Sequence, residues 1–160
     1  MIIRQLQQND FSSVAEIYRQ GIATGTATFE TTVPAWNEWN KKYIESCRIV
    51  ADEKKFITGF AVLSKTSVRE AYKGVCEVTV YVHEKHRGKG IGKILLQKLI
   101  EQSEENGIWT LQATIFAENK ASVNIHEQCG FRLVGYREKI AQRNGEWKNT
   151  VLMERRSKNI

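Results

Sequence analysis

A glycine-rich stretch in the middle of the chain has the residue types and spacing needed to bind a phosphate group. In residues 80–97, three glycines and several basic side chains lie between a strand-like run and a helix-like run. The first amide groups of a helix lack internal partners, and the helix dipole makes that end positive. Glycine has no Cβ to keep an anion away from these amides. The stretch therefore predicts an anion site made of Arg87, Gly88, Lys89, Gly90, Ile91, Gly92 and Lys93.

Two familiar phosphate-binding motifs do not match this stretch. The Walker A motif requires a Gly-Lys-Ser/Thr sequence after its first glycine and four further residues, and none follows. The dinucleotide-binding fingerprint fails because Lys93 stands where its third glycine is required. We also expect no βαβ unit around the loop. Taken alone, the stretch fits a solvated basic turn as well as it fits an anion site.

A carboxylate in an apolar strand is the best candidate for moving a proton. Glu77 interrupts the run Val75–Val82, where partial burial would strengthen it as a general base. Alternation along the strand supports another interpretation, in which Glu77, Thr79 and Tyr81 share a solvent-facing side. The histidines, in contrast, show no spacing typical of metal ligands, and we expect no bound metal.

Composition narrows the class of protein. The 160 residues, 41% hydrophobic and 26% charged, fit one globular domain over residues 1–160. No apolar run approaches the roughly 20 residues that span a bilayer, and no secretory signal is expected. Cys47, Cys76 and Cys129 are widely spaced in apolar settings, which favours reduced core thiols in a cytoplasmic protein.

The net charge of +6 does not identify a partner by itself. A positive charge suits nucleic acid, and it suits a small anionic ligand equally well. A nucleic-acid-binding module would interleave aromatic side chains with a basic stripe, and that pattern is missing. We therefore expect neither a nucleic-acid partner nor a membrane, and keep the nucleic-acid module as the remote alternative.

Apolar periodicity predicts strands that alternate with helices. We expect Asn9 to cap a first helix, with Gly21 and Gly25 loosening its end, and Pro34 to open a second. A third helix would present Ile91, Ile94, Leu95 and Leu99 on one face, and a fourth, within 119–131, would stop at Gly130. The strands expected are 1–6, 47–52, 56–65, 74–82 and 109–117, followed by a hairpin around residues 143–145, and the second helix is expected to run over 34–44.

Two segments together resemble the cofactor-binding elements of the GNAT superfamily of N-acetyltransferases. The order Arg-x-x-Gly-x-Gly in residues 87–92 resembles that superfamily's pyrophosphate loop for acetyl-coenzyme A. Residues 119–131 are similar to its second cofactor segment, in which an asparagine opens a helix that ends in Gly-Phe. Asn119, Ser122 and His126 are three and four residues apart, which places them on one helix face. The resemblance implies an α/β (α+β) GNAT fold, with a mixed, mostly antiparallel sheet of about seven strands and about four helices.

Three further segments resemble one branch, the phosphinothricin N-acetyltransferase-like proteins. Residues 26–31 look like its substrate loop, and residues 144–149 like its closing hairpin. Residues 69–82 resemble its Arg-x-Ala-Tyr stretch, followed eight residues after the arginine by a glutamate on the central strand. Two residues near the expected acceptor pocket depart from the branch: Gly74 stands where some members have tryptophan, and Asn149 where aspartate is frequent.

The resemblance implies an acetyl-coenzyme A-dependent N-acetyltransferase that uses no metal. In the GNAT fold the central strand splays from its parallel neighbour, and the pantetheine arm lies in the opening. The strand residues Val80, Tyr81 and Val82 should then meet the cofactor, while the amides of residues 87–92 take the pyrophosphate. Asn119 should reach the pantetheine or the acetyl end, with Ser122 beside it.

The same resemblance gives Glu77 and His126 catalytic roles. Glu77 would remove a proton from the amine, directly or through a water. His126 occupies the place of a tyrosine that protonates the coenzyme A thiolate in many members. An imidazole titrates near roughly 6.5 and a thiol near roughly 8.5, so this transfer is feasible. A packing role for His126 remains the alternative.

For the acceptor, the resemblance implies the α-amine of phosphinothricin or of a related amino acid such as methionine sulfoximine. Arg69 would hold the acceptor carboxylate with its planar guanidinium, while Phe29 and Tyr72 form apolar walls. Arg69 as a plain surface cation is the alternative. Other acceptors stay open: a peptide N-terminus, a polyamine or an aminoglycoside. Branch members commonly form homodimers, for which residues 143–147 and 34–44 are candidate contact surfaces.

Overall fold

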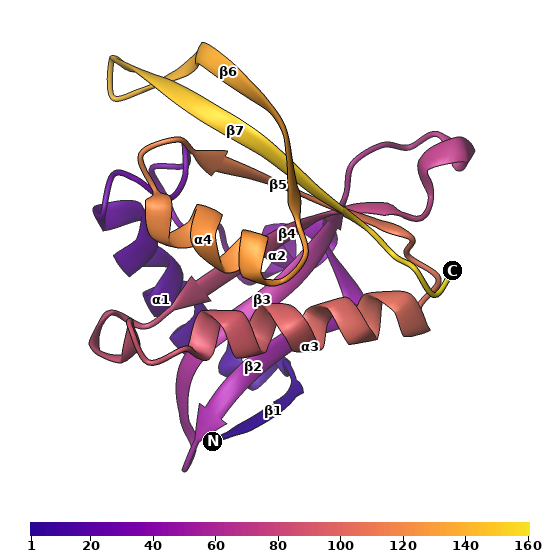
Figure 1. Ribbon diagram of the computed structural model, residues 1–160. Helices are drawn as coiled ribbons and strands as arrows, with labels where there is room; N and C mark the ends of the chain where they lie inside the picture. Colours follow the sequence, from indigo (N-terminus) through magenta and orange to yellow (C-terminus); the bar gives the residue numbers. More distant parts are fainter.

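Seven strands form one sheet, and the computed structural model describes all of residues 1–160 (Figure 1). The strands are β1 (Ile2–Gln5), β2 (Tyr43–Glu53), β3 (Phe56–Lys65), β4 (Val75–Val82), β5 (Thr110–Phe116), β6 (Arg132–Arg143) and β7 (Glu146–Arg156). Their order across the sheet is β1-β2-β3-β4-β5-β7-β6. All neighbouring pairs are antiparallel except β4 and β5. The expectation of a mixed, mostly antiparallel sheet is confirmed.

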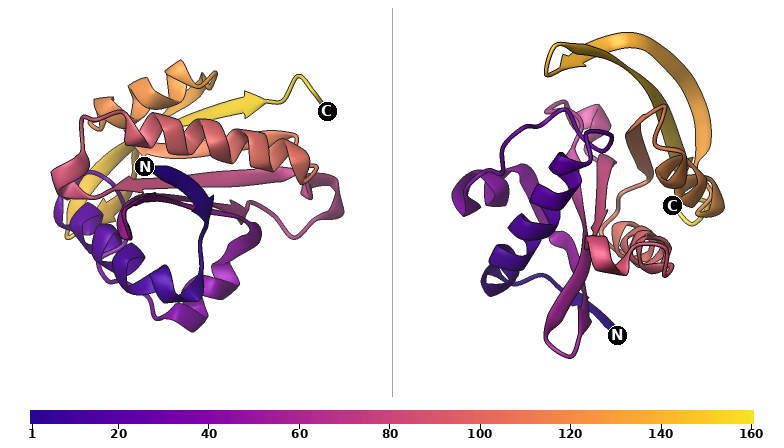
Figure 2. Two further views of the ribbon diagram at one scale, coloured as in Figure 1. Left: turned by 90° about the horizontal axis from the view of Figure 1, so that it is seen from below. Right: turned by 90° about the vertical axis from the view of Figure 1, so that its left-hand side faces the viewer.

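Helices cover both faces of this sheet. They are α1 (Phe11–Ala23), α2 (Trp36–Lys42), α3 (Ile91–Glu105) and α4 (Lys120–Gln128), with short 3₁₀ turns η1 (Gln8–Asp10), η2 (Glu70–Tyr72) and η3 (Glu84–His86). Figure 2 shows α1 and α2 on one face, α3 and α4 on the other, and the β6–β7 hairpin arching over the top. None of these helices combines the length and the apolar composition that a membrane crossing needs.

Each face of the sheet has its own apolar core. On the α3 side, Leu95 and Leu99 are fully buried against strand residues such as Leu63. On the α1 side, Ile17 packs with Phe60 in the second cluster. Alternating side chains of β3 therefore serve opposite cores, as the strand period of two requires.

The three cysteines are buried and free, as expected for core thiols. Burial raises the pKa of the Cys76 thiol to about 11, and also raises those of Cys47 and Cys129. A thiol with a raised pKa is a poor nucleophile at neutral pH, because only the thiolate reacts readily. The cysteines thus belong to the core.

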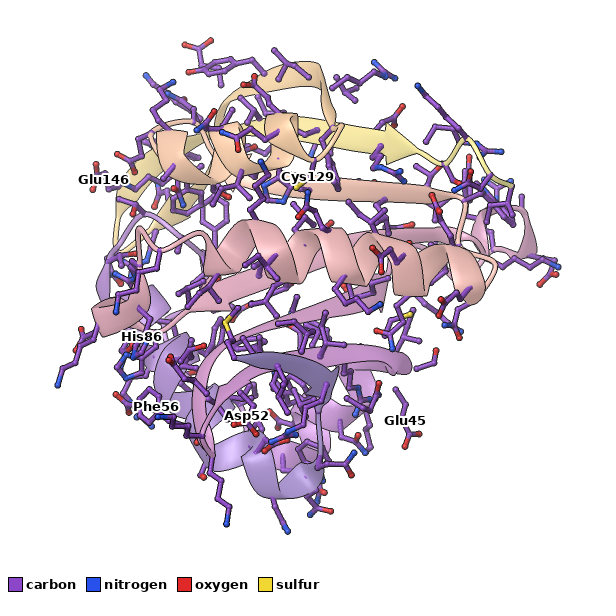
Figure 3. All side chains as sticks on the ribbon, turned by 60° about the horizontal axis from the view of Figure 1, so that its bottom comes forward. Glu45, Asp52, Phe56, His86, Cys129 and Glu146 are labelled. Atoms are coloured by element: carbon purple, nitrogen blue, oxygen red, sulfur yellow. The ribbon has the colours of Figure 1, made fainter.

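The loop around residues 83–90 crosses from β4 to α3 beside an aromatic cluster. The ring of Phe56, at the start of β3, lies 5.4 Å from the ring of His86, and both are labelled in Figure 3. The amide of His83 donates a hydrogen bond to the Thr58 carbonyl at 2.9 Å. These contacts join the beginning of the loop to β3.

Two expected helix boundaries are wrong. Asn9 does not cap α1; it lies within η1, and Asp10, held by Arg4 at 2.8 Å, occupies the cap position. The second helix ends at Lys42 rather than at residue 44, because Tyr43 already pairs with β3.

Two expectations about single residues of α3 and α1 are also wrong. Ile94 is 40% exposed, whereas the other residues expected on that face of α3, Ile91, Leu95 and Leu99, are buried. Gly21 does not loosen the end of α1: a Cβ there would lie 2.4 Å from the Tyr81 ring. Glycine at this position lets the helix approach β4.

The absence of a βαβ unit around the glycine loop is a further expectation that the structure contradicts. β4 and β5 are parallel, and α3 forms the crossover between them. Parallel neighbours require such a crossover, whereas antiparallel neighbours need only a hairpin turn. The hairpin expected around residues 143–145 is confirmed, with Asn144 and Gly145 at φ of 50° and 79°.

Candidate functional site

The site begins where β4 and β5 separate. The two strands pair only over Val75–Glu77 and Thr110–Gln112. Beyond Glu77, β4 continues to pair with β3, and β5 continues to pair with β7, but the two no longer pair with each other. One edge of the β4 backbone is therefore free to bond a ligand, because main-chain polar groups need partners.

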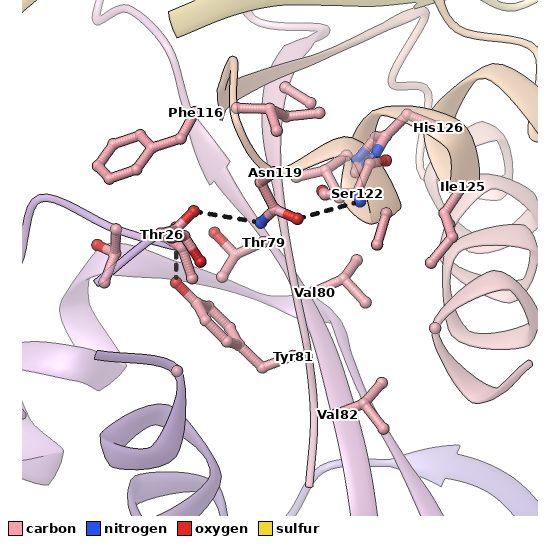
Figure 4. Close-up of a pocket in the computed structure, with 18 of the residues that line it drawn as sticks. Thr26, Thr79, Val80, Tyr81, Val82, Phe116, Asn119, Ser122, Ile125 and His126 are labelled. Carbon is pink, nitrogen blue, oxygen red and sulfur yellow. Dashed lines mark hydrogen bonds between the residues drawn. The ribbon is translucent and has the colours of Figure 1, made fainter. Parts of the chain in front are cut away.

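A cavity of about 870 Å³ occupies this opening. In Figure 4, Val80 and Val82 point toward α4, whereas Thr79 and Tyr81 point toward the loop that contains Thr26. The cavity thus reaches both faces of the sheet. The predicted site residues that line it are Phe29, Glu77, Val80, Tyr81, Val82, Arg87, Gly88, Gly90, Ile91, Gly92, Lys93, Asn119, Ser122 and His126.

The glycine loop at one end of the cavity has the geometry of an anion cradle. Gly88 and Gly90 have φ of 75° and 81°, and Gly90 is the residue before the first turn of α3. A Cβ at either glycine would meet nothing within 4 Å, so the backbone conformation, and not crowding, requires glycine there. The open space also leaves the first amides of α3 accessible. These residues fit a pyrophosphate.

Two neighbours hold the cradle in place. The Arg87 Nε donates to the Val82 carbonyl at 3.3 Å, which fastens the loop to the end of β4. A Cβ on Gly92 would lie 3.4 Å from the Ile125 Cδ1, at ordinary van der Waals distance, so this part of α3 lies beside α4. Lys93 also lines the cavity, whereas the exposed Lys89 does not.

Glu77 lies at the last paired position, where the strands begin to separate. Its side chain is partly exposed and lines the cavity. The Gln112 Nε2, from β5, donates to Glu77 Oε2 at 2.9 Å. One carboxylate oxygen is thereby oriented, and the other is available to a group in the cavity. This arrangement suits a general base, because the carboxylate is both held and accessible.

His126 is 94% buried in α4, since only 6% of its surface is exposed. Its Nδ1 lies 2.7 Å from the Ser122 carbonyl and must donate a proton to it. The Nε2 atom is buried without a hydrogen-bond partner. Burial lowers the pKa of this imidazole, so the ring is neutral at pH 7. It must gain a proton at Nε2 before it can protonate a thiolate.

Asn119 connects the start of α4 to the loop that contains Thr26. Its Oδ1 accepts a hydrogen bond from the Ser122 amide at 3.2 Å and so caps α4. Its Nδ2 donates to the Thr26 carbonyl at 3.3 Å, and Figure 4 shows both bonds. Both polar ends of the side chain are therefore engaged within the protein, and contact with the cofactor stays a prediction.

Two predicted acceptor residues lie outside the cavity. Arg69 and Tyr72 belong to the exposed turn around η2, where the guanidinium lies 5.5 Å from the Tyr72 ring centroid. Phe29, by contrast, lines the cavity and packs edge-on to Phe116 at 4.6 Å. The structure thus brings Glu77, Phe29 and the predicted cofactor residues other than Lys89 together, but not Arg69 and Tyr72.

The two departures from the branch have local structural roles. A Cβ on Gly74 would lie 2.1 Å from the Trp109 ring, so the side chain just before β5 already fills that space. The Asn149 Oδ1 accepts a hydrogen bond from the Lys139 amide at 2.8 Å, at an irregular point of the β6–β7 hairpin. Neither residue lines the cavity.

Several lining residues escaped the sequence analysis. Tyr18 and Tyr43 are mostly buried and belong to an apolar stripe, so their types indicate core rather than site. Thr114 and Phe116 lie on β5 and face the opening only because β4 leaves it. The alternate threonines Thr24, Thr26 and Thr28 were the one local signal of a polar wall.

The sequence of this chain is similar to those of known acetyltransferases. Residues 7–131 match the acetyltransferase (GNAT) family. An L-methionine sulfoximine/L-methionine sulfone acetyltransferase of Pseudomonas aeruginosa is 29% identical over 158 residues, covering 95% of this chain and 92% of that protein. A phosphinothricin N-acetyltransferase of Alcaligenes faecalis is 29% identical, covering 96% of this chain and 81% of that protein.

Solved structures agree in fold. A GNAT superfamily phosphinothricin acetyltransferase from Sinorhizobium meliloti, in complex with acetyl-coenzyme A, superposes with a TM-score of 0.87. It is 30% identical, and the match covers 97% of this chain and 87% of that one. The seven-stranded sheet with its splayed central strands is therefore the fold of these proteins.

Proposed function

Since the chain belongs to the acetyltransferase (GNAT) family and is an acetyl-coenzyme A-dependent N-acetyltransferase, we propose that its acceptor is the α-amine of an amino acid such as phosphinothricin or methionine sulfoximine. The activities of the Pseudomonas aeruginosa and Alcaligenes faecalis relatives support this acceptor class. The single structural observation that carries the acetyl-transfer part of the proposal is the splayed pair of strands, with Glu77 at the separation point and the glycine loop at the far end.

In this proposal the cofactor binds mainly to backbone. The free edge of Val80, Tyr81 and Val82 bonds the pantetheine arm. The amides of residues 87–92 take the pyrophosphate, while the side chains at the rim of the loop add ionic contacts. Ser122 and Asn119 lie beside the acetyl end. The ionic rim consists of Arg87, Lys89 and Lys93.

The chemical step needs one proton removed and one supplied. The amine nitrogen attacks the thioester carbonyl carbon, a C–N bond forms and the C–S bond breaks. Glu77 takes the proton from the amine, directly or through a water. His126, once protonated at Nε2, gives a proton to the departing thiolate. Glu77 then releases its proton to solvent and His126 regains one, so both side chains return to their starting protonation states.

The acceptor side chain would pack on Phe29, inside the cavity. Arg69 and Tyr72 do not reach the cavity of their own chain, so we propose them as acceptor contacts only for a site that a second chain completes. The β6–β7 hairpin supports a homodimer, since it carries large apolar side chains that are about half exposed. These are Leu133, Val134, Tyr136, Ile140 and Trp147.

Segment 34–44, the second candidate contact surface for a homodimer, is less available. In segment 34–44, Trp39 and Tyr43 are 3% and 7% exposed, so they serve the core of their own chain. A contact there would depend on the half-buried Trp36. We also propose a cytoplasmic location, because free buried thiols fit a reducing compartment.

Thiol release from acetyl-coenzyme A tests the proposal, with phosphinothricin, methionine sulfoximine, spermidine and a short peptide offered as acceptors. We expect turnover with the two amino acids, and preference for spermidine or the peptide would reject the acceptor class. Arg69→Ala should raise the acceptor KM if a second chain supplies the guanidinium. Full activity of this variant on amino-acid acceptors would show that the carboxylate clamp is wrong.

A further inference from the structure

The loop of residues 24–30 forms one wall of the cavity without being a helix or a strand. Its backbone is held instead by side chains from distant elements. The Asn119 Nδ2 bonds the carbonyl of Thr26, and the Tyr81 hydroxyl bonds that of Ala27 at 3.4 Å. The next carbonyl along the chain is bonded by a third side chain. Consecutive carbonyls are thus fixed by three different elements.

That third side chain is Arg143, at the end of β6. Its Nε donates to the Thr28 carbonyl at 3.1 Å, and its Nη2 donates to the Ile22 carbonyl at 2.7 Å. The second bond meets the last turn of α1, where the Ile22 carbonyl also accepts from the Gly25 amide at 3.1 Å and where a cation is favourable. A single planar guanidinium therefore connects both ends of the loop.

The guanidinium lies against the backbone of the loop at Gly25. Gly25 has φ of 71°, and a Cβ built on it would lie 3.5 Å from the Arg143 Nη1. Lysine has one charged nitrogen on a flexible stem and cannot hold two carbonyls with the fixed fork of arginine. Arg143 is only partly buried and does not itself line the cavity.

We infer that Arg143 is a positioning residue for the acceptor, acting through the loop 24–30 that it fastens to α1 and β6. The inference rests on the proposed function, in which Phe29 of this loop contacts the acceptor. It assigns a task to the β6–β7 hairpin within one chain, separate from any pairing of two chains. Loss of the fork should loosen the acceptor wall and leave the phosphate cradle in place.

The test compares Arg143→Met and Arg143→Lys with the wild-type protein, and uses Arg137→Met as the matched control. Arg137 lies on the same strand, is exposed and makes no side-chain hydrogen bond. Two quantities are measured: amide hydrogen exchange of residues 24–30, and the KM for each substrate. In Arg143→Met we expect faster exchange and an acceptor KM raised about tenfold, since two charge-assisted hydrogen bonds are lost. The KM for acetyl-coenzyme A should change less than about twofold. For Arg143→Lys, the exchange rate and the acceptor KM should lie between those of the wild-type protein and those of Arg143→Met.

Each departure from this pattern overturns the inference. Unchanged exchange in Arg143→Met would show that Arg143 does not fasten the loop. Faster exchange with an unchanged acceptor KM would show that the loop does not position the acceptor. A raised KM with unchanged exchange would make Arg143 a direct contact instead. If the wild-type protein acetylates no amino acid, the proposed function fails, while the exchange measurement still decides the role of Arg143.

Discussion

The two ends of the cavity are built in opposite ways. The cofactor end consists of consecutive backbone, running along β4 and through the glycine loop into α3. The acceptor end is an irregular loop whose carbonyls are bonded by Tyr81, Asn119 and Arg143, which lie 54, 93 and 115 residues from their partners.

This difference determines which amino-acid substitutions each end of the cavity tolerates. Backbone amides are present whatever the side chain, so the cofactor end depends on conformation and therefore on glycine. The acceptor wall depends on the identity of a few long-range side chains. Substitutions should accordingly separate the two ends in their kinetic effects, and Glu77, at the junction, should affect the chemical step common to both.

The largest effect is expected from Glu77→Gln. If Glu77 is the general base, its removal should lower kcat by about 100-fold, with little change in either KM. Steady-state rates across a pH series measure this effect, and Glu45→Gln, an exposed residue of β2, is the control. A variant that retains both kcat and its pH profile would contradict the assignment of Glu77.

Gly90→Ala should damage the cofactor end alone. The substitution places a side chain at φ of 81° and disturbs the first amides of α3, so the Kd of acetyl-coenzyme A should rise about tenfold. Titration calorimetry measures this affinity. Gly107→Ala is the matched control, because Gly107 also has positive φ, at 73°, with open space around it, but lies far from the cradle. Equal losses in both variants would point to general destabilisation.

His126→Phe sharpens the comparison within α4. If His126 protonates the thiolate, kcat should fall by about tenfold while the acceptor KM stays within about twofold. Phenylalanine preserves the edge-on packing of this ring near Phe131, at 5.0 Å between centroids. An unchanged kcat would assign His126 a packing role.

The smallest effect concerns stability and pH. Burial lowers the pKa of His126 in the folded protein below its ordinary value of 6.5, so the unfolded chain binds the proton first as pH falls. The free energy of unfolding therefore has its full value above pH 6.5. As the pH falls below 6.5, proton binding to the unfolded chain lowers this free energy by at most about 1.4 kcal/mol per pH unit. Urea unfolding between pH 7 and pH 5 should show a weaker pH dependence in His126→Phe than in wild type. Parallel curves would show that the histidine titrates alike in both states.

Local pattern was sufficient to predict most of the elements, whereas the prediction of the cofactor end also needed the family resemblance. Strand alternation in β3 and β4, the glycines of the loop, and the Asn144-Gly145 turn each act through neighbours in sequence. The errors occurred where distant residues decide. Gly21 is glycine because of Tyr81, and α2 stops early because Tyr43 joins β3.

The sequence by itself determined the conformation of the predicted phosphate cradle, since positive φ at Gly88 and Gly90 and the start of α3 are properties of one short stretch. Only the tertiary structure decided the acceptor wall. The bonds from Tyr81, Asn119 and Arg143 to one loop exist because the sheet, α4 and the hairpin fold together around it. Tertiary structure also placed Arg69 outside the cavity of its own chain, because the turn around η2 lies beyond the paired start of β4 and β5.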